Sequence, residues 1–158
     1  MFTIRRATPD DATALGRLGA MLMRTHYAFD PQRFLSPGDA PELGYASFLR
    51  SQLRQKDAVI FVAELHGGEV AGYVYAGLEP MSWKELRDAA GFVHDVAVDP
   101  SARRLGIAAA LLDAATAWLK EHGAPRVVLW TAEPNADAQR LFARSGFRRT
   151  MLEMTKEL

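Results

Sequence analysis

The sequence contains no cysteine, no excess of charge of either sign and no long apolar run. Without cysteine, the chain can form neither disulfides nor thiolate metal sites. Lysine and arginine (19) balance aspartate and glutamate (19), so no basic surface for nucleic acid or for an anionic membrane is expected. Ile107–Leu112, one of the longest apolar runs, has six residues and is too short to cross a membrane. Because Met1–Arg6 lacks the apolar core of a signal peptide, a cytoplasmic location is predicted.

One globular domain is predicted over residues 1–158. The chain is 49% hydrophobic and 24% charged, as soluble domains commonly are, and no repeat or low-complexity linker divides it. A chain of this length buries roughly two thirds of the surface of its unfolded form, so its core needs no metal or disulfide. The stretch 30–41, which is rich in proline, glycine, serine and aspartate, is interpreted as a loop inside this domain.

Hydrophobic periodicity predicts a mixed α/β fold in which helices flank one sheet. Two alternating segments around Gly67 and Gly68 predict an antiparallel hairpin. The almost continuous apolar segment 127–131 predicts a strand that is buried on both faces. In chain order, strands are expected at 2–7, 58–65, 70–78, 92–98, 127–131 and 147–154, and helices from Thr8 to about 24, at 42–55, from 105 to Gly123 and at 135–144, with an aromatic loop at 26–34.

The segment Val96–Ala108 joins a predicted strand to the start of a predicted helix. The first N–H groups of a helix lack internal partners and lie at the positive end of its dipole, so they favour phosphate groups. Arg103 and Arg104 add positive charge, and small residues at Gly106 and Ala108 allow a ligand to approach the backbone closely. This pattern suits a pyrophosphate. The alternative is an ordinary capped helix with two solvated arginines.

The same segment resembles the signature of the GNAT superfamily of acyl-CoA-dependent N-acetyltransferases. That signature, Arg or Gln, any two residues, Gly, any residue, then Gly or Ala, is matched by Arg103, Gly106 and Ala108. The resemblance covers essentially the whole chain and implies a mostly antiparallel central sheet, flanked by helices and splayed between its fourth and fifth strands. A second family block follows in the right order, matched by Asn135, Ala138, Leu141, Phe142, Gly146 and Phe147.

The resemblance also implies where acetyl-CoA binds. Its pantetheine arm is expected to lie along Val96, Ala97 and Val98, like a short added strand that pairs with the backbone of the first and last of these residues. Asn135, which is otherwise a plain helix cap, and Phe142 are expected to line the far side of the arm. The pyrophosphate is expected at the backbone amides of Arg103, Arg104, Leu105, Gly106, Ile107, Ala108 and Ala109.

Phe142 departs from the family pattern, in which a tyrosine is common and is thought to protonate the departing thiolate. Phenylalanine has no proton to give. The thiol of coenzyme A resembles a free cysteine, with a pKa of about 8.5, so its thiolate can leave near neutral pH and be protonated by solvent. Tyr73, Tyr75 and Tyr27 are candidate replacements, with half-buried structural aromatics as the alternative interpretation.

Two polar residues, His94 and Asp95, interrupt the apolar fourth strand just before Val96. A histidine has a reference pKa of about 6.5 and can relay a proton at physiological pH, so His94 is the first candidate for the general base. Asp95 is expected to orient a water or to bind the ammonium group. Strand alternation places the two side chains on opposite faces and makes direct contact unexpected. Glu79 and Glu153 are further candidates, and a satisfied buried polar pair is the structural alternative.

These residues predict an N-acetyltransferase that transfers an acetyl group from acetyl-CoA to a primary amine by direct attack, with no metal and no covalent enzyme intermediate. The Val96 N–H is the expected donor to the thioester carbonyl. The alternative is a non-catalytic acyl-CoA-binding or regulatory module, which Phe142 makes plausible. The first two helices and the loop at 26–34 are expected to cover a small-molecule or peptide amine. No nucleic acid or membrane partner is expected, and the resemblance is compatible with a homodimer.

Overall fold

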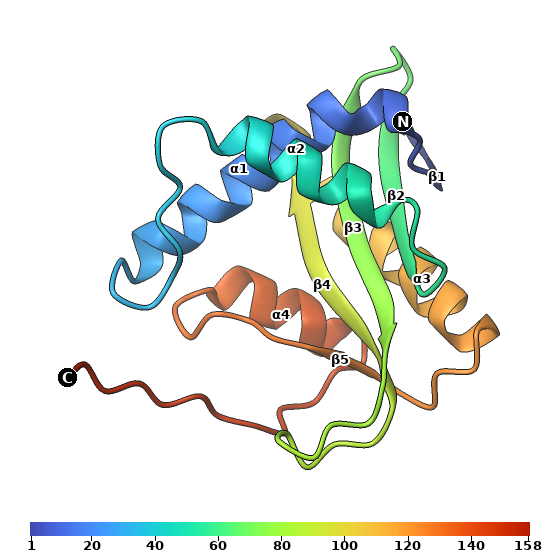
Figure 1. Ribbon diagram of the computed structural model, residues 1–158. Coiled ribbons are helices and arrows are strands. Elements are labelled where there is room, and N and C mark those ends of the chain that lie inside the picture. Colours follow the sequence, from blue (N-terminus) through green and yellow to red (C-terminus); the bar gives the residue numbers. More distant parts are fainter.

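The computed structural model describes residues 1–158 around a five-stranded sheet (Figure 1). Its strands lie in the order β1 (Phe2–Arg6), β2 (Ala58–Leu65), β3 (Val70–Glu79), β4 (Ala90–Val98) and β5 (Val127–Leu129). Neighbouring strands are antiparallel from β1 to β4, whereas β4 and β5 are parallel. The predicted mixed, mostly antiparallel sheet is therefore confirmed, and so is the hairpin of β2 and β3.

Helices cover both faces of this sheet (Figure 1). α1 (Ala12–Phe29) and α2 (Pro41–Gln52) lie on one face, α3 (Ile107–Glu121) lies on the other, and α4 (Ala136–Arg144) lies beside β5. The short 3-10 turns η1 (Pro9–Asp11) and η2 (Pro100–Ala102) precede α1 and α3. α1 continues through residues 26–29, which the sequence pattern assigned to a loop, because no glycine or proline lies between Gly19 and Pro31. None of the helices has the length and apolar character that a membrane crossing requires.

Each face of the sheet has its own hydrophobic core. Val74 of β3 and Leu111 of α3 belong to one core, which includes the apolar side of α3. Tyr73, the preceding residue of β3, points to the opposite face and packs with Leu15 of α1 and Leu49 of α2. Full burial of each such leucine stabilises the fold by about 2 kcal/mol. The α1–α2 pair is thereby fixed over the same face as the tyrosines of β3.

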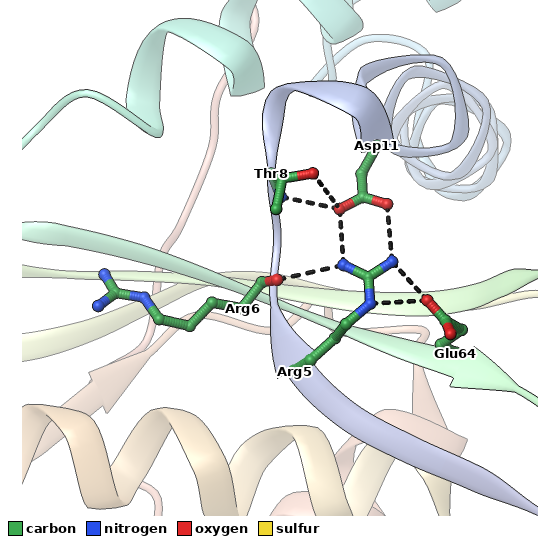
Figure 2. Close-up of polar contacts among 5 residues, drawn as sticks. All are labelled: Arg5, Arg6, Thr8, Asp11 and Glu64. Carbon is green, nitrogen blue, oxygen red and sulfur yellow. Dashed lines mark hydrogen bonds and ion pairs between the residues drawn. The ribbon is translucent and has the colours of Figure 1, made fainter. Parts of the chain in front are cut away.

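A buried carboxylate joins β1 to the start of α1 (Figure 2). Asp11 is 7% exposed and accepts two hydrogen bonds from the Arg5 guanidinium, at 2.9 and 3.0 Å, and one from the Thr8 N–H at 2.8 Å. Arg5 also donates to Glu64 of β2 at 2.7 Å. The hydrogen bonds from Arg5 are the main cause that lowers the pKa of Asp11 below its ordinary value, against the effect of burial. This carboxylate is therefore ionised, satisfied and structural.

A β-bulge in β4 changes the direction of two candidate site residues. Tyr75 pairs with Asp95, whereas the next residue of β3 already pairs with Val93. His94 is thus an extra residue, and alternation is broken at this point. Its ring lies 4.8 Å from the ring of Tyr75, while Asp95 accepts a hydrogen bond from Tyr73 on the same face of β3. The prediction that His94 and Asp95 point to opposite faces is wrong, because it assumed an unbroken strand.

The sheet ends at β5, and no strand follows α4. β5 has three residues with half-buried side chains, so it is shorter and less covered than the predicted strand 127–131. Residues 147–154 form no strand and lead away from the sheet toward the C-terminus (Figure 1). A strand needs an edge to pair with, and after the turn at Gly146 the chain leaves the short edge of β5. The predicted last strand is therefore wrong for this chain.

Candidate functional site

A run of unpaired backbone N–H groups leads into α3. The N–H groups of residues 104–109 donate to no acceptor in the chain, and the next one, of Ala110, bonds to the Gly106 carbonyl at 3.1 Å. Gly106 precedes the helix in the left-handed conformation, with φ +82°, which glycine adopts without the steric cost of a side chain. Arg103, Arg104 and Leu105 are exposed beside these amides. The arrangement has the donors and the positive charge that the predicted anion site requires.

Asp99 fixes the loop that carries these amides. It accepts hydrogen bonds from the Ser101 N–H at 3.0 Å and the Ser101 hydroxyl at 2.7 Å, and from Arg17 of α1 at 2.5 Å. The hydrogen bonds from Ser101, followed by that from Arg17, lower the pKa of Asp99 to about 2. The loop is therefore held by an ionised carboxylate between β4 and α1, and its amides are preorganised for a ligand.

The edge of β4 that faces β5 is open beyond Val93, where the parallel pairing ends. The Asp99 N–H bonds to β3, so by alternation Val96 and Val98 direct their backbone N–H and C=O groups toward the open side. The side chain of Ala97 points into the core beneath α1 and α2. This opening is the predicted splay between the fourth and fifth strands. It leaves backbone groups with which an extended ligand can pair.

A cavity of about 310 Å³ lies where β4 and β5 separate. His94, Asp95 and Val96 of β4 line it, α1, the following loop and α2 line one side, and the end of β5 with α4 lines the other. No lysine or arginine lines the cavity, and Asp95 is its only carboxylate. α1, the loop after it and α2 therefore cover the cavity, as predicted for the first two helices and the loop at 26–34. Tyr45 is the lining residue from α2.

Asp95 lies in this cavity between two tyrosines. Tyr45 and Tyr73 both donate to its Oδ2 atom, at 2.6 and 2.9 Å, and no hydrogen bond from the chain reaches Oδ1. Burial raises the pKa of Asp95 above its ordinary value, against the effect of the tyrosine hydrogen bonds. Burial also raises the pKa of both tyrosines, so they remain protonated donors. Gly19 of α1 makes room for Tyr45, because a Cβ atom there would lie 2.1 Å from Cδ1 of the ring.

His94 and Glu79 form a pair at the edge of the same cavity. The Nε2 atom of His94 lies 3.2 Å from Oε1 of Glu79, and their side chains are 30% and 39% exposed. The imidazole is held by ring contacts with Tyr75 and Phe92, whose centroids lie 4.8 and 5.7 Å away. His94 also lines a neighbouring cavity of about 290 Å³ together with Glu79. The three predicted catalytic residues, His94, Asp95 and Glu79, are therefore close together.

α4 places Asn135 and Phe142 on the opposite side of the cavity. Asn135 Oδ1 accepts a hydrogen bond from the Ala138 N–H at 3.2 Å, which makes it the helix cap that the sequence predicts. Its side chain also lines the cavity, so the cap and a ligand contact are compatible. Phe142 is half-buried between the core beneath α3 and the cavity. Both residues lie across from the open edge of β4.

None of the three candidate tyrosines replaces the hydroxyl that Phe142 lacks. The Tyr73 hydroxyl donates to Asp95, and the Tyr75 hydroxyl donates to Gln52 at 2.8 Å. Burial, together with the charges of Asp95 and Glu79, raises the pKa of Tyr75 to about 12. Tyr27 does not line the cavity. In the free protein, the Tyr73 hydroxyl thus binds Asp95, the Tyr75 hydroxyl binds Gln52, and Tyr27 lies outside the cavity.

Sequence reasoning missed several residues of the cavity and included one that lies outside it. Tyr45 was not singled out within the predicted helix 42–55, because its partner Asp95 is 50 residues away in the chain. His26 of α1 and Trp130 after β5 also line the cavity, and Trp130 is 74% exposed. A tryptophan within the predicted strand 127–131 was the one available signal. Glu153, in contrast, is paired with Arg33 at 2.6 Å and lies outside the cavity.

Known proteins resemble the chain in sequence and in structure. Residues 21–147 match the Acetyltransferase (GNAT) family. An uncharacterized N-acetyltransferase of Methanocaldococcus jannaschii is 28% identical over 146 residues, which cover 92% of this chain and 60% of that protein. A mycothiol acetyltransferase of Thermomonospora curvata is 31% identical over 121 residues, which cover 73% of this chain and 38% of that protein. The chain thus spans less than two thirds of these relatives.

Solved structures share the fold over nearly the whole chain. A tetramutant of the BH1408 protein from Bacillus halodurans superposes with a TM-score of 0.83 at 21% identity, over 99% of both chains. The aminoglycoside N-acetyltransferase AAC(6')-Iy, in complex with CoA, has a TM-score of 0.80 at 18% identity, over 100% of this chain and 95% of that chain. At such identities the likeness shows the fold. With the family match over residues 21–147, it establishes that the chain belongs to the GNAT family of acetyltransferases.

Proposed function

We propose that the chain, as one domain over residues 1–158, is an acetyl-CoA-dependent N-acetyltransferase that acetylates a primary amine. One observation carries the proposal. Three features lie in order along β4 and the loop after it: the cavity at Asp95, the open edge at Val96 and Val98, and the unpaired amides of residues 104–109. The amides can hold an anion, the edge can pair with an extended arm, and the cavity can hold an amine. Membership of the GNAT family supports this order of sites.

The residues of the loop and of β4 divide the binding of acetyl-CoA between them. The amides of residues 104–109, with Arg103 and Arg104, bind the pyrophosphate, and the backbone of Val96 and Val98 pairs with the pantetheine arm. Acetyl-CoA supplies the acetyl group as a thioester. The Val96 N–H donates to the thioester carbonyl oxygen and stabilises the charge that develops there. Asn135 and Phe142 line the other side of the arm.

In the proposed reaction the amine attacks the thioester directly, with no metal and no covalent enzyme intermediate. The nitrogen forms a bond to the acetyl carbon, the C–S bond breaks, and CoA leaves as a thiolate. An alkylamine with a pKa of about 10.4 is protonated at pH 7, and its deprotonation costs about 4.6 kcal/mol. The enzyme must therefore provide a proton acceptor.

His94 is the proposed acceptor of that proton. Glu79, at 3.2 Å from Nε2, can accept a hydrogen bond from it and thereby hold the tautomer in which Nδ1 is unprotonated. Nδ1 then receives the proton from the amine, directly or through one water. Because Phe142 has no hydroxyl and the nearby tyrosines are engaged, solvent protonates the thiolate.

A structural neighbour supports the class of both substrates. AAC(6')-Iy has been solved with CoA and with the bisubstrate analogue CoA-S-monomethyl-acetylneamine. By analogy, acetyl-CoA is the proposed cosubstrate and a small-molecule amine the proposed acceptor, with a peptide amine as the alternative. A non-catalytic acyl-CoA-binding module is the second candidate function, because Phe142 lines the cavity where the family commonly carries a tyrosine.

Release of free CoA thiol tests the proposal. The protein is incubated with acetyl-CoA and a panel of amines and peptides, and mass spectrometry detects the acetylated product. Thiol release that depends on an amine, and is unchanged by a metal chelator, is the expected result. Thermal stabilisation by acetyl-CoA without acetylation of any acceptor would favour the binding module. Absence of both stabilisation and turnover would contradict the proposal.

Two further expectations belong to the same proposal. The backbone of residues 148–158 forms no hydrogen bond within the chain, and the segment exposes Met151, Leu152, Met154 and Leu158, while β5 has a free outer edge. We propose that this segment of one copy packs against a second copy, so that light scattering detects a homodimer and Leu152→Asp weakens it. A protein that is monomeric at micromolar concentration would contradict this. A cytoplasmic location is proposed as well, and cell fractionation tests it.

A further inference from the structure

The cavity at Asp95 has a lining of strongly biased chemistry. Eleven of its sixteen lining residues are hydrophobic, and none is a lysine or an arginine. The side formed by α1 and the following loop is apolar and aromatic, with Leu22, Met23, Phe34 and Leu35. Such a lining favours an apolar ligand body and provides no cation for a carboxylate or phosphate group.

Asp95 is the one acidic group in this lining, and half of its binding capacity is unused. An ionised carboxylate has about four acceptor positions. Two tyrosine hydroxyls fill those of Oδ2, and no group of the chain donates to Oδ1. These hydroxyls are neutral, so the carboxylate has neither a cationic partner nor a full set of donors. A half-buried charge in this state gains free energy from a cation that also donates a hydrogen bond.

The two histidines of the cavity form no ion pair with Asp95, and their charges lower its pKa less than the tyrosine hydrogen bonds do. His26 Nδ1 lies 2.8 Å from the Leu22 carbonyl, and His94 Nε2 lies beside Glu79. No hydrogen bond joins either ring to Asp95. Asp95 Oδ1 can therefore accept a hydrogen bond from a ligand. An ammonium group combines the required charge with the required donors.

We propose, on the basis of the function proposed above, that the acceptor is a primary amine with a single positive charge and an apolar body. Its ammonium group donates to Asp95 Oδ1, and its body packs against the apolar side formed by α1 and the following loop. A carboxylate or phosphate on the acceptor would meet no cation in the cavity. A second ammonium would meet no second carboxylate there, since Glu79 and Glu85 outside it are paired with His94 and Arg87.

Tyr45 is the positioning residue of this proposal. It belongs to α2, which covers the cavity, and its 2.6 Å hydrogen bond holds the Asp95 carboxylate so that Oδ1 is left for the ligand. The ring is fixed by the space at Gly19 and by an edge contact with Phe48, with centroids 6.1 Å apart. The Tyr45 side chain therefore connects α2, which covers the cavity, to the proposed ammonium site at Asp95.

Three matched amines test the proposed class. 2-Phenylethylamine has the proposed features, phenylalanine adds a carboxylate to the same body, and butane-1,4-diamine replaces the ring by a second ammonium. We expect kcat/KM for 2-phenylethylamine to exceed both of the others by roughly tenfold or more. Calorimetry with CoA present measures binding of the same amines without turnover and should give the same order. Preference for phenylalanine or the diamine in both measurements would overturn the proposal.

Asp95→Asn tests the ammonium site, because asparagine keeps the shape and an oxygen for the two tyrosines. We expect roughly tenfold or more weaker binding of 2-phenylethylamine and unchanged binding of CoA. Tyr45→Phe should raise KM more than it lowers kcat. Glu42→Gln, whose carboxylate is paired with Arg24 of α1 at 2.6 Å outside the cavity, is the matched control and should bind normally.

These readouts separate the two proposals. Equal binding of 2-phenylethylamine to Asp95→Asn and to the unmodified protein would overturn the ammonium site, even if the protein acetylates amines. Selective binding that Asp95→Asn abolishes, without turnover of any amine, would support the ammonium site and contradict the enzymatic function. If Asp95→Asn does not fold, loss of selectivity for 2-phenylethylamine in Tyr45→Phe supports the assignment, and unchanged selectivity contradicts it.

Discussion

Asp11 is buried and Asp95 is half-buried at the cavity, and the groups around the two carboxylates differ. Asp11 accepts hydrogen bonds from the Arg5 guanidinium and from the backbone of Thr8 (Figure 2), so its charge is neutralised within the chain. Asp95 accepts hydrogen bonds from two neutral tyrosine hydroxyls and has no cationic partner. Correspondingly, the pKa of Asp11 lies below its ordinary value, and that of Asp95 lies above it.

This difference separates a structural carboxylate from a functional one. Arg5 completes the site of Asp11, which joins β1 to the start of α1 and does not line the cavity at Asp95. The partner that would complete the site of Asp95 is absent from the chain, and the carboxylate lines a cavity. A desolvated carboxylate without its own cation reduces stability, so the fold tolerates Asp95 where a ligand can supply the charge. Variants in the two regions should accordingly affect different properties.

The largest expected effect is on turnover, at the cavity. His94→Ala should lower kcat by roughly a hundredfold or more, because it removes the proposed proton acceptor, and should leave acetyl-CoA affinity nearly unchanged. The acidic limb that a histidine base imposes on the pH–rate profile should disappear. If turnover and the acidic limb both survive, His94 is structural and Glu79 with a water chain becomes the next candidate, which Glu79→Gln would examine.

A comparable effect is expected on cofactor binding at the start of α3. Acetyl-CoA at a hundredfold excess over its Kd should stabilise the protein by about 2.7 kcal/mol. Gly106→Asp should abolish this shift, since it places a negative charge beside the free amides. Gly106→Asn is the matched control, because asparagine has nearly the same shape and also tolerates the left-handed conformation that Gly106 adopts.

The two Gly106 variants separate charge from backbone strain. A stabilisation by acetyl-CoA that is the same in Gly106→Asp as in Gly106→Asn would show that the pyrophosphate does not bind at this loop. Loss of the shift in both variants would point to the glycine conformation as the requirement.

A smaller effect, on stability, distinguishes the two carboxylates directly. Asp11→Asn should lower the free energy of unfolding at pH 7 by about 2 kcal/mol, because Arg5 loses its ionised partner. Asp95→Asn should leave stability unchanged or raise it, since no cation loses a partner. Urea unfolding of both variants at pH 7 measures the difference. Equal destabilisation by both substitutions would contradict the distinction.

The pH dependence of stability should follow opposite directions at the two sites. The pKa of Asp11 is lowered by folding, so its contribution is present above the unfolded pKa of about 3.9 and lost as the pH falls through the folded pKa. The pKa of Asp95 is raised, so its contribution is present below the unfolded pKa and lost as the pH rises through the folded pKa. Urea unfolding from pH 2 to 8 measures both contributions. The loss of stability at low pH should disappear in Asp11→Asn, and the loss with rising pH should disappear in Asp95→Asn.

The smallest effect is expected at Phe142. Phe142→Tyr adds one hydroxyl to a half-buried ring that lines the cavity, so folding should be retained and turnover should rise or stay the same. Steady-state kinetics with a good acceptor measures this. A strong decrease in kcat at unchanged acetyl-CoA affinity would show that Phe142 does not lie beside the thioester.

Local sequence signals predicted the fold well wherever the deciding interactions are local. The Gly67–Gly68 hairpin and the cap at Asn135 depend on a few neighbouring residues. The bulge at His94 depends on the register with β3, which no local pattern encodes. The predicted strand 147–154 failed because a strand also requires a free partner edge.

The candidate site was predictable in part for the same reason. The amides at the start of α3 follow from a contiguous motif, and His94, Asp95 and Glu79 were identified as polar residues in or at the ends of apolar strands. Tyr45 was missed because its role comes from a hydrogen bond between α2 and β4, which only the packing of the helices on the sheet creates. The charge state of Asp95 depends on that same packing.

Carboxyl-carbon NMR titration of the aspartates, in the presence and absence of 2-phenylethylamine with CoA bound, tests the difference between Asp11 and Asp95. Asp95 is expected to titrate above the ordinary aspartate value of about 3.9 in the free protein, and Asp11 below it. Addition of the amine should lower the pKa of Asp95, because the ammonium stabilises its charged form, and should leave Asp11 unchanged. A pKa of Asp95 at or below the ordinary value, or one that the amine does not change, would contradict the proposed ammonium site at Asp95.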